Sequence, residues 1–184
     1  MGVYVALLRG LNVSKGNRIS MRDLVPLFEE AGCERVKSYV QSGNIVFRLD
    51  EAKIAGLPDV VESWIAERFG VRTWIVLRDI QAMRATVDNN PYEDLNAPPT
   101  SVAVAFRRKQ EAPIEFTFAG DLSAIPDRIE VRGNDCYLYL PNGFSGSKFP
   151  PNFFSKDLGE TTTRNWRTVT KLLDMMEEIA DIET

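Results

Sequence analysis

The sequence contains no histidine, only two cysteines and no long hydrophobic run. The lack of histidine excludes serine-histidine-aspartate and cysteine-histidine catalysis, histidine-ligated zinc, and the commonest general base near neutral pH. Carboxylate, lysine and Mg²⁺-assisted chemistry remain. Few enzyme classes fit this composition, and the sequence leaves the identity of any cofactor unknown.

The scarcity of cysteine and of apolar runs points to a cellular compartment. The apolar run from Val3 to Leu8 ends at Arg9 and is too short for a signal peptide or for a membrane span of about 20 residues. Cys33 and Cys136 lie far apart in a chain without an export signal, so we expect free thiols rather than a disulfide. We therefore expect a soluble cytoplasmic protein with no membrane partner.

The net charge of −4 hides an uneven distribution. Residues 1–48 hold seven Lys and Arg against four Asp and Glu, and residues 145–172 hold five against two. Residues 173–184 hold five acidic residues and no basic one. An acidic protein disfavours nonspecific binding of polyanions, but a local basic site remains compatible with this distribution.

The first half predicts a β-α-β-β-α-β order. Strands are expected at 3–8 and 71–77 and a hairpin at 35–49, with helices before Gly32 and between Pro58 and Gly70. The first helix begins either after Asp23, with Pro26 in its first turn, or after Ser20 with a kink; the proline favours Asp23. This order is typical of the ferredoxin-like fold.

The second half predicts a smaller α+β unit. Asp79 caps a short helix, 101–107 forms a strand, and 128–141 forms a hairpin, whereas residues 109–128 are ambiguous. The final helix is expected to start near Thr162 or Thr163 and to end near Ile179. We thus predict an α+β protein with subdomains at 1–78 and 79–184.

The final helix is predicted to carry two faces. Apolar residues recur at helical spacing, which predicts core packing, at Trp166, Val169, Leu173 and Met176. Arg164, Arg167 and Lys171 form a second stripe near the start of the helix. Cations there oppose the helix dipole, so the stripe is either a solvated, ion-paired face or part of an anion site.

Two glycine-containing loops could also meet an anion. The loop "LRGLNVSKGNRIS" follows a buried strand and contains Arg9, Asn12, Lys15, Asn17 and Arg18, while "NGFSGSKF" contains Ser145, Ser147 and Lys148. Neither has the Walker A or G-x-G-x-x-G spacing, so an ordinary polar loop remains the alternative. At the first hairpin, Gln41 and Asn44 are residues that usually serve turns.

A nucleic-acid partner has weaker support. Tyr4 occupies the position of the first-strand aromatic of an RNA-recognition motif, but "SGNIVF" lacks the stacking aromatics of the third strand. No carboxylate pair has a spacing that predicts hydrolysis or metal binding.

Four motifs, "YVALLRGLNVSKGNRISM", "YVQSGNIVF", "GFSGSKF" and "TRNWRTVTKL", occur in this order. Together they resemble the bacterial domain-of-unknown-function family 1697 over essentially the whole chain. The resemblance implies a small cytosolic α+β protein with a ferredoxin-like first half and no established activity. The positions that it carries over are Arg9, Gly10, Asn12, Gln41, Ser42, Gly43, Asn44, Ser147, Lys148, 164–168 and Lys171. The first loop departs from the family pattern, because Lys15 is displaced by one position.

Our leading hypothesis is a binding site for a small anionic ligand, phosphorylated or nucleotide-like, in a basic cleft between the subdomains. The residues expected to form it are Arg9, Asn12, Lys15, Ser147, Lys148, Arg164, Asn165, Arg167 and Lys171, with Asn17, Gln41 and Asn44 in a secondary position.

The competing hypothesis is a protein-protein interaction or regulatory module. The basic start and the acidic end of the final helix could pair reciprocally in a homodimer. An enzyme ranks third, because the sequence offers no recognisable nucleophile or metal set.

Overall fold

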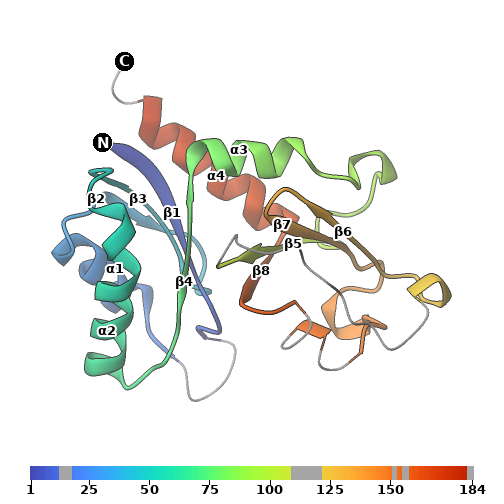
Figure 1. The fold of residues 1–184 in the computed structure, drawn as a ribbon, viewed down its shortest axis with the longest axis horizontal. Coiled ribbons are helices and arrows are strands. Elements are labelled where there is room, and N and C mark those ends of the chain that lie inside the picture. The colour runs from blue at the N-terminus through green and yellow to red at the C-terminus, as the bar shows by residue number, and fades with distance from the viewer. Residues whose placement is uncertain (13–17, 109–121, 151–152, 155–157, 182–184) are drawn as a thin grey trace. The chain divides into compact units, whose positions relative to one another are not determined.

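The computed structural model describes residues 1–12, 18–108, 122–150, 153–154 and 158–181. These residues form helices and two antiparallel four-stranded sheets (Figure 1), which confirms the α+β class. The chain divides into two compact units: unit 1 is Met1–Arg84 with Lys171–Thr184, and unit 2 is Ala85–Thr170. Both divisions fall inside helices, α3 (Ile80–Asp88) and α4 (Trp166–Ala180).

The sheet of unit 1 has the order β2-β3-β1-β4. The strands are β1 (Gly2–Leu8), β2 (Glu34–Ser38), β3 (Asn44–Leu49) and β4 (Ile75–Asp79), and the helices between them are α1 (Met21–Glu30) and α2 (Leu57–Phe69). The predicted β-α-β-β-α-β order is therefore present. Strand β1 is central and pairs antiparallel with both neighbours, with Val5 opposite Val46 and Arg78.

Helix α1 begins at Met21, so the start favoured from the sequence, after Asp23, is wrong. Ser20 is the N-cap: its Oγ accepts a hydrogen bond from the Asp23 amide at 3.2 Å and donates one to Asp23 Oδ2 at 2.7 Å. This reciprocal cap satisfies an amide that the helix leaves free, and the carboxylate suits the helix dipole. Pro26 consequently lies inside the helix.

One face of this sheet packs against α1 and α2. Tyr4, Ala6 and Leu8 of β1 point toward this core, and the rings of Phe28 and Phe47 lie 5.4 Å apart within it. Burial of each large apolar side chain contributes about 1.5–3 kcal/mol, so this core holds the two helices on the sheet.

The opposite face of the same sheet is also buried. Val5, Val46 and Val76 are at most 1% exposed. Lys37, whose register partner is Val46, forms an ion pair of 3.6 Å with Glu178 of α4. The second half of α4 belongs to unit 1 and carries the buried side chains of Leu172, Met175, Met176 and Ile179, so we infer that it covers this face.

The sheet of unit 2 has the order β6-β7-β5-β8. Its strands are β5 (Val102–Arg107), β6 (Arg128–Arg132), β7 (Asp135–Tyr139) and β8 (Thr161–Asn165). The hairpin predicted around Gly133 joins β6 to β7, and its turn gives Gly133 a positive φ of 58°. Short 3₁₀ segments lie at Ile54–Gly56 (η1), Glu93–Leu95 (η2), Leu122–Ala124 (η3) and Phe144–Gly146 (η4).

The prediction that the final helix starts near Thr162 or Thr163 is wrong. Residues 161–165 form β8, which pairs with β5 so that Arg164 lies opposite Val104. Helix α4 begins only at Trp166, and the Asn165 Oδ1 accepts a hydrogen bond from the Thr168 amide at 2.9 Å. Consecutive β-branched threonines favour a strand, and the side chain of Asn165 provides the helix cap.

The buried face of α4 is also shifted from the predicted one. Val169 and Met176 are fully buried as predicted, and Leu172 and Ile179 complete this face. Leu173 and Trp166, also predicted for this face, are only half-buried. No helix in the described ranges has the length and apolar character that a membrane span requires.

Candidate functional site

A pocket of about 350 Å³ opens at the loops of unit 1. Its lining joins the loop after β1 to the start of α1 and to the β2-β3 turn, through Asn12, Arg18, Ile19, Ser20 and Gln41. Two predicted residues, Asn12 and Gln41, are thus brought together here. Arg18, named above with the same loop, was not among the residues expected to bind the ligand, yet it lines this pocket.

Asn12 holds this loop together through its side-chain amide. Its Nδ2 donates to the carbonyl oxygens of Ile19, at 2.9 Å, and of Gln41, at 2.5 Å. Its Oδ1 accepts a hydrogen bond from the Ile19 amide at 3.0 Å. The amide that was predicted to orient a ligand therefore fixes the walls of the pocket.

Three residues around the pocket have a left-handed backbone. Asn12, Val40 and Gly43 have φ values of 61°, 50° and 71°. Asparagine and glycine adopt this region readily, whereas a β-branched valine is strained there. Val40 is 51% exposed, so burial of its side chain does not explain the strain.

Arg9 lies at the end of β1 and is positioned by an aromatic ring. Its guanidinium carbon is 5.1 Å from the centroid of Trp74, and its backbone is fixed by hydrogen bonds from the Arg9 amide to Trp74 O and from Thr73 Oγ1 to Arg9 O. No carboxylate of the described chain pairs with this guanidinium. Arg9 is half-buried, and its contact with the Trp74 ring leaves it without an ion pair in the described chain.

Asn44 has a structural role in the β2-β3 turn. It is fully buried, and its Nδ2 donates to Tyr39 O at 3.0 Å and to Ser42 Oγ at 2.9 Å. Lys15 and Asn17, also predicted as ligand residues, lie outside the described residues.

In unit 2, Ser147 and Lys148 surround a buried carboxylate. The Asp127 Oδ2 accepts hydrogen bonds from Ser147 Oγ, at 2.7 Å, and from the Lys148 amide, at 2.5 Å. Asp127 is 2% exposed, whereas the Lys148 side chain is exposed. Asp127 was not predicted, because it lies about twenty residues before its partners, in the segment 109–128 whose structure the sequence left ambiguous.

Arg164 does not belong to a helical basic stripe, so that prediction is wrong. It lies on β8, is 8% exposed, and its Nη1 donates to Thr162 Oγ1 at 2.8 Å and to Thr163 O at 2.9 Å. Burial lowers the pKa of Arg164 to about 10, because the low-dielectric surroundings disfavour the charged form. The guanidinium is still protonated at neutral pH.

The other predicted residues of this segment have different roles. Asn165 caps α4 through the hydrogen bond described above, and Arg167 is exposed in the first turn of α4. The Lys171 ammonium lies 3.9 Å from Glu178. Of these residues, Arg167 is the exposed cation for which no described carboxylate is a partner.

The acidic end of α4 forms ion pairs within unit 1. Glu178 contacts both Lys37 and Lys171, and Glu177 accepts a hydrogen bond from Arg84 Nε at 3.1 Å. All these side chains are 42–56% exposed, so solvent screens the pairs and each contributes little to stability. A homodimer through these same charges would have to compete with the internal pairs.

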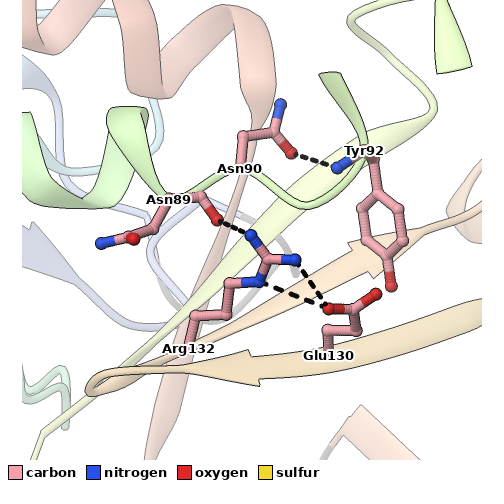
Figure 2. A network of polar contacts seen from close by, with 5 residues as sticks. All are labelled: Asn89, Asn90, Tyr92, Glu130 and Arg132. Carbon is pink, nitrogen blue, oxygen red and sulfur yellow. Dashed lines mark hydrogen bonds and ion pairs between the residues drawn. The ribbon is translucent and has the colours of Figure 1, made fainter. Parts of the chain in front are cut away.

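A polar network beside the end of α3 was not predicted (Figure 2). Arg132 donates to Glu130 Oε2 at 3.2–3.3 Å and to Asn89 O at 3.4 Å. The nearby Tyr92 hydroxyl is buried and has no hydrogen-bond partner among the described residues. Burial raises the pKa of Tyr92, and the charge of Glu130 raises it further. The pairing of Glu130 with Arg132 could have been predicted from the alternation in "RIEVR", because residues two apart on a strand point to the same face.

The described residues contain no group of three or more carboxylates and cysteines that could hold a metal ion. Cys33 and Cys136 are free, and burial raises the pKa of each thiol to about 12. Almost no thiolate exists at neutral pH, so neither cysteine is suited to nucleophilic chemistry.

Comparisons with known proteins extend these findings. The family described as "Protein of unknown function (DUF1697)" matches residues 1–137, in agreement with the resemblance of the motifs. A solved structure, a conserved bacterial protein from Streptococcus pneumoniae, is 19% identical with a TM-score of 0.69, covering 96% of this chain and 99% of the other. At that identity the likeness shows a shared fold. No curated protein matches the sequence.

Proposed function

Because the chain belongs to the family of proteins of unknown function DUF1697, no family activity guides us, and we propose from its own geometry that it binds a small anionic ligand, phosphorylated or nucleotide-like. The observation that carries the proposal is the open pocket of unit 1, which Arg18 lines and whose walls are fixed by Asn12. A guanidinium presents parallel N–H donors that match phosphate or carboxylate oxygens.

Three properties of the pocket support this proposal. Arg18 is exposed and has no carboxylate partner in the described chain, so its charge is not neutralised internally. Gln41 also lines the pocket and supplies a second polar residue. The strained backbone at Val40 adjoins it, and such strain is concentrated at ligand-binding and active sites.

The N-terminus of α1 contributes less to anion binding than an uncapped helix N-terminus would. The Asp23 carboxylate already accepts the Ser20 hydroxyl proton there and occupies the positive end of the helix dipole. The positive charge in the proposal therefore comes from arginine side chains, and among the described residues of unit 1 these are Arg18 at the pocket and Arg9 after β1.

The proposal is tested by ligand-dependent melting. We expect phosphate, sugar phosphates and nucleotides to include at least one anion that raises the melting temperature. At a ligand concentration of 100 times Kd, binding stabilises the protein by about 2.7 kcal/mol, or roughly 5–10 °C for a chain of this length. Arg18→Ala should abolish the shift. Arg22→Ala removes an exposed arginine of α1 that does not line the pocket and should retain it.

Two results would contradict the proposal. One is that no anion raises the melting temperature of the wild-type protein. The other is that Arg18→Ala and Arg22→Ala respond equally.

The topology and location that the sequence suggested are also part of our proposal. A ferredoxin-like assignment of unit 1 is supported by β3 lying between β1 and β2, which gives a split β-α-β arrangement. A cytoplasmic location is proposed from the sequence alone.

A further inference from the structure

Asp127 is a buried carboxylate without a cationic partner among the described residues. It is 2% exposed, and both of its hydrogen bonds, from Ser147 Oγ and the Lys148 amide, go to Oδ2. Its Oδ1 is buried and has no hydrogen-bond partner within the described ranges. An under-satisfied buried carboxylate is unfavourable for stability, so its presence calls for a role beyond holding a loop.

The Ser147 hydroxyl has the geometry of an activated nucleophile. Its oxygen donates its proton to the Asp127 carboxylate at 2.7 Å and accepts a hydrogen bond from the Phe149 amide at 3.2 Å. The carboxylate can remove the proton, and the amide can stabilise the negative charge that develops on the oxygen. Ser147 is half-buried rather than sealed in the core.

We propose that Ser147 accepts a phosphoryl group from a small phosphoanhydride or acyl phosphate, with Asp127 as the general base. Ser147 Oγ forms a bond to phosphorus, the bond between phosphorus and the leaving oxygen breaks, and the leaving group departs with that electron pair. The hydroxyl proton passes to Asp127 Oδ2. An aspartate performs the same task for substrate hydroxyls in protein kinases, and it needs no histidine.

Lys148 favours phosphoryl transfer over acyl transfer. Its amide is held by Asp127, while its side chain is exposed next to the reacting serine. A lysine ammonium there would stabilise the negative charge of the transferred group and of the phosphoserine that forms. This inference concerns unit 2 and does not require ligand binding at Arg18.

The test is intact-mass and fragment mass spectrometry of the full chain after incubation with acetyl phosphate or ATP and Mg²⁺. We expect a mass increase of one phosphoryl group, located on Ser147 by fragmentation. Asp127→Asn keeps a hydrogen-bond acceptor but removes the base, and it should slow the reaction about 100-fold or more. Lys148→Gln should slow it about tenfold.

Ser145 provides the matched control, because it is an exposed serine two residues away in the same loop. Ser145→Ala should react like the wild-type protein, whereas Ser147→Ala should not react. Arg18→Ala should also retain the reaction, which separates this inference from the proposed ligand site. No phosphorylation of the wild-type chain, or a phosphoryl group located at another residue, would overturn the proposal. Because the wild-type fragment spectrum locates the group, the test stands even if a variant misfolds.

Discussion

At the residue scale, Gly43 shows most directly how the motif "QSGN" specifies structure. Its φ is 71°, and a Cβ at this position would lie 2.8 Å from the Leu8 Cβ and 3.1 Å from Leu11 Cδ1. We expect Gly43→Ala to lower the free energy of unfolding by about 2–4 kcal/mol, through backbone strain and the clash together. Urea unfolding monitored by circular dichroism measures this change.

Gly10 is the control for this substitution. It has a nearly equal φ of 69°, but a Cβ at this position would meet no described atom within 4 Å. Gly10→Ala therefore isolates the strain and should lower the free energy of unfolding by only about 1 kcal/mol. Equal losses for the two variants would show that the contact with Leu8 has no importance.

The asparagines show why site residues are harder to predict than core residues. Asn12 and Asn44 were predicted as ligand residues because amides suit ligands, but both donate their amide hydrogens to backbone carbonyls of the same chain. A side-chain amide uses the same N–H donor and the same oxygen acceptor whether it binds a ligand or stabilises a turn. Only the positions of Ile19, Gln41 and Tyr39 in space decide between these roles.

At the scale of elements, α1 contains a feature that should reduce its stability. Pro26 is exposed inside the helix, where it cannot donate a hydrogen bond to the carbonyl four residues earlier. We expect Pro26→Ala to raise the free energy of unfolding by about 1–3 kcal/mol, because it restores that donor and loses no buried contact. The readout is the urea midpoint at an unchanged m value.

A neighbouring exposed residue of α1 serves as the comparison. Glu29→Ala changes the helix surface without altering a backbone donor and should shift the free energy of unfolding by less than about 0.5 kcal/mol. If Pro26→Ala is no more stable than the wild-type protein, the proline is accommodated without loss at this position.

Most elements could be predicted from local patterns, and β8 shows where such patterns fail. Strands β1, β3 and β5 are predictable because they are short runs of mainly apolar residues. Helix α2 is predictable because it has a proline at its start and a glycine with a left-handed backbone at its end. In "TTTRN", a threonine serves equally as a helix cap or as a strand residue. Pairing with β5, through contacts about sixty residues apart in sequence, decides the outcome, and it also buries Arg164.

At the scale of the molecule, two domain boundaries can be compared by experiment, and they differ in whether the second half of α4 belongs to the first unit. The sequence-based prediction is a unit of residues 1–78, whereas compactness groups Met1–Arg84 with Lys171–Thr184. The second group includes the ion pair between Lys37 and Glu178 and the buried second half of α4.

We expect residues 1–78 alone to lack cooperative unfolding, because the sheet face that contains Val5, Val46 and Val76 would be exposed to water. Each such side chain loses about 1.5 kcal/mol or more of burial free energy, and the stability of a whole domain is only about 5–15 kcal/mol. A chain that joins 1–84 to 171–184 through a flexible Gly/Ser linker should unfold cooperatively in urea and give a dispersed amide NMR spectrum. Equal stability of the two fragments would instead support the boundary at residue 78, and would mean that α4 is not needed to cover this sheet.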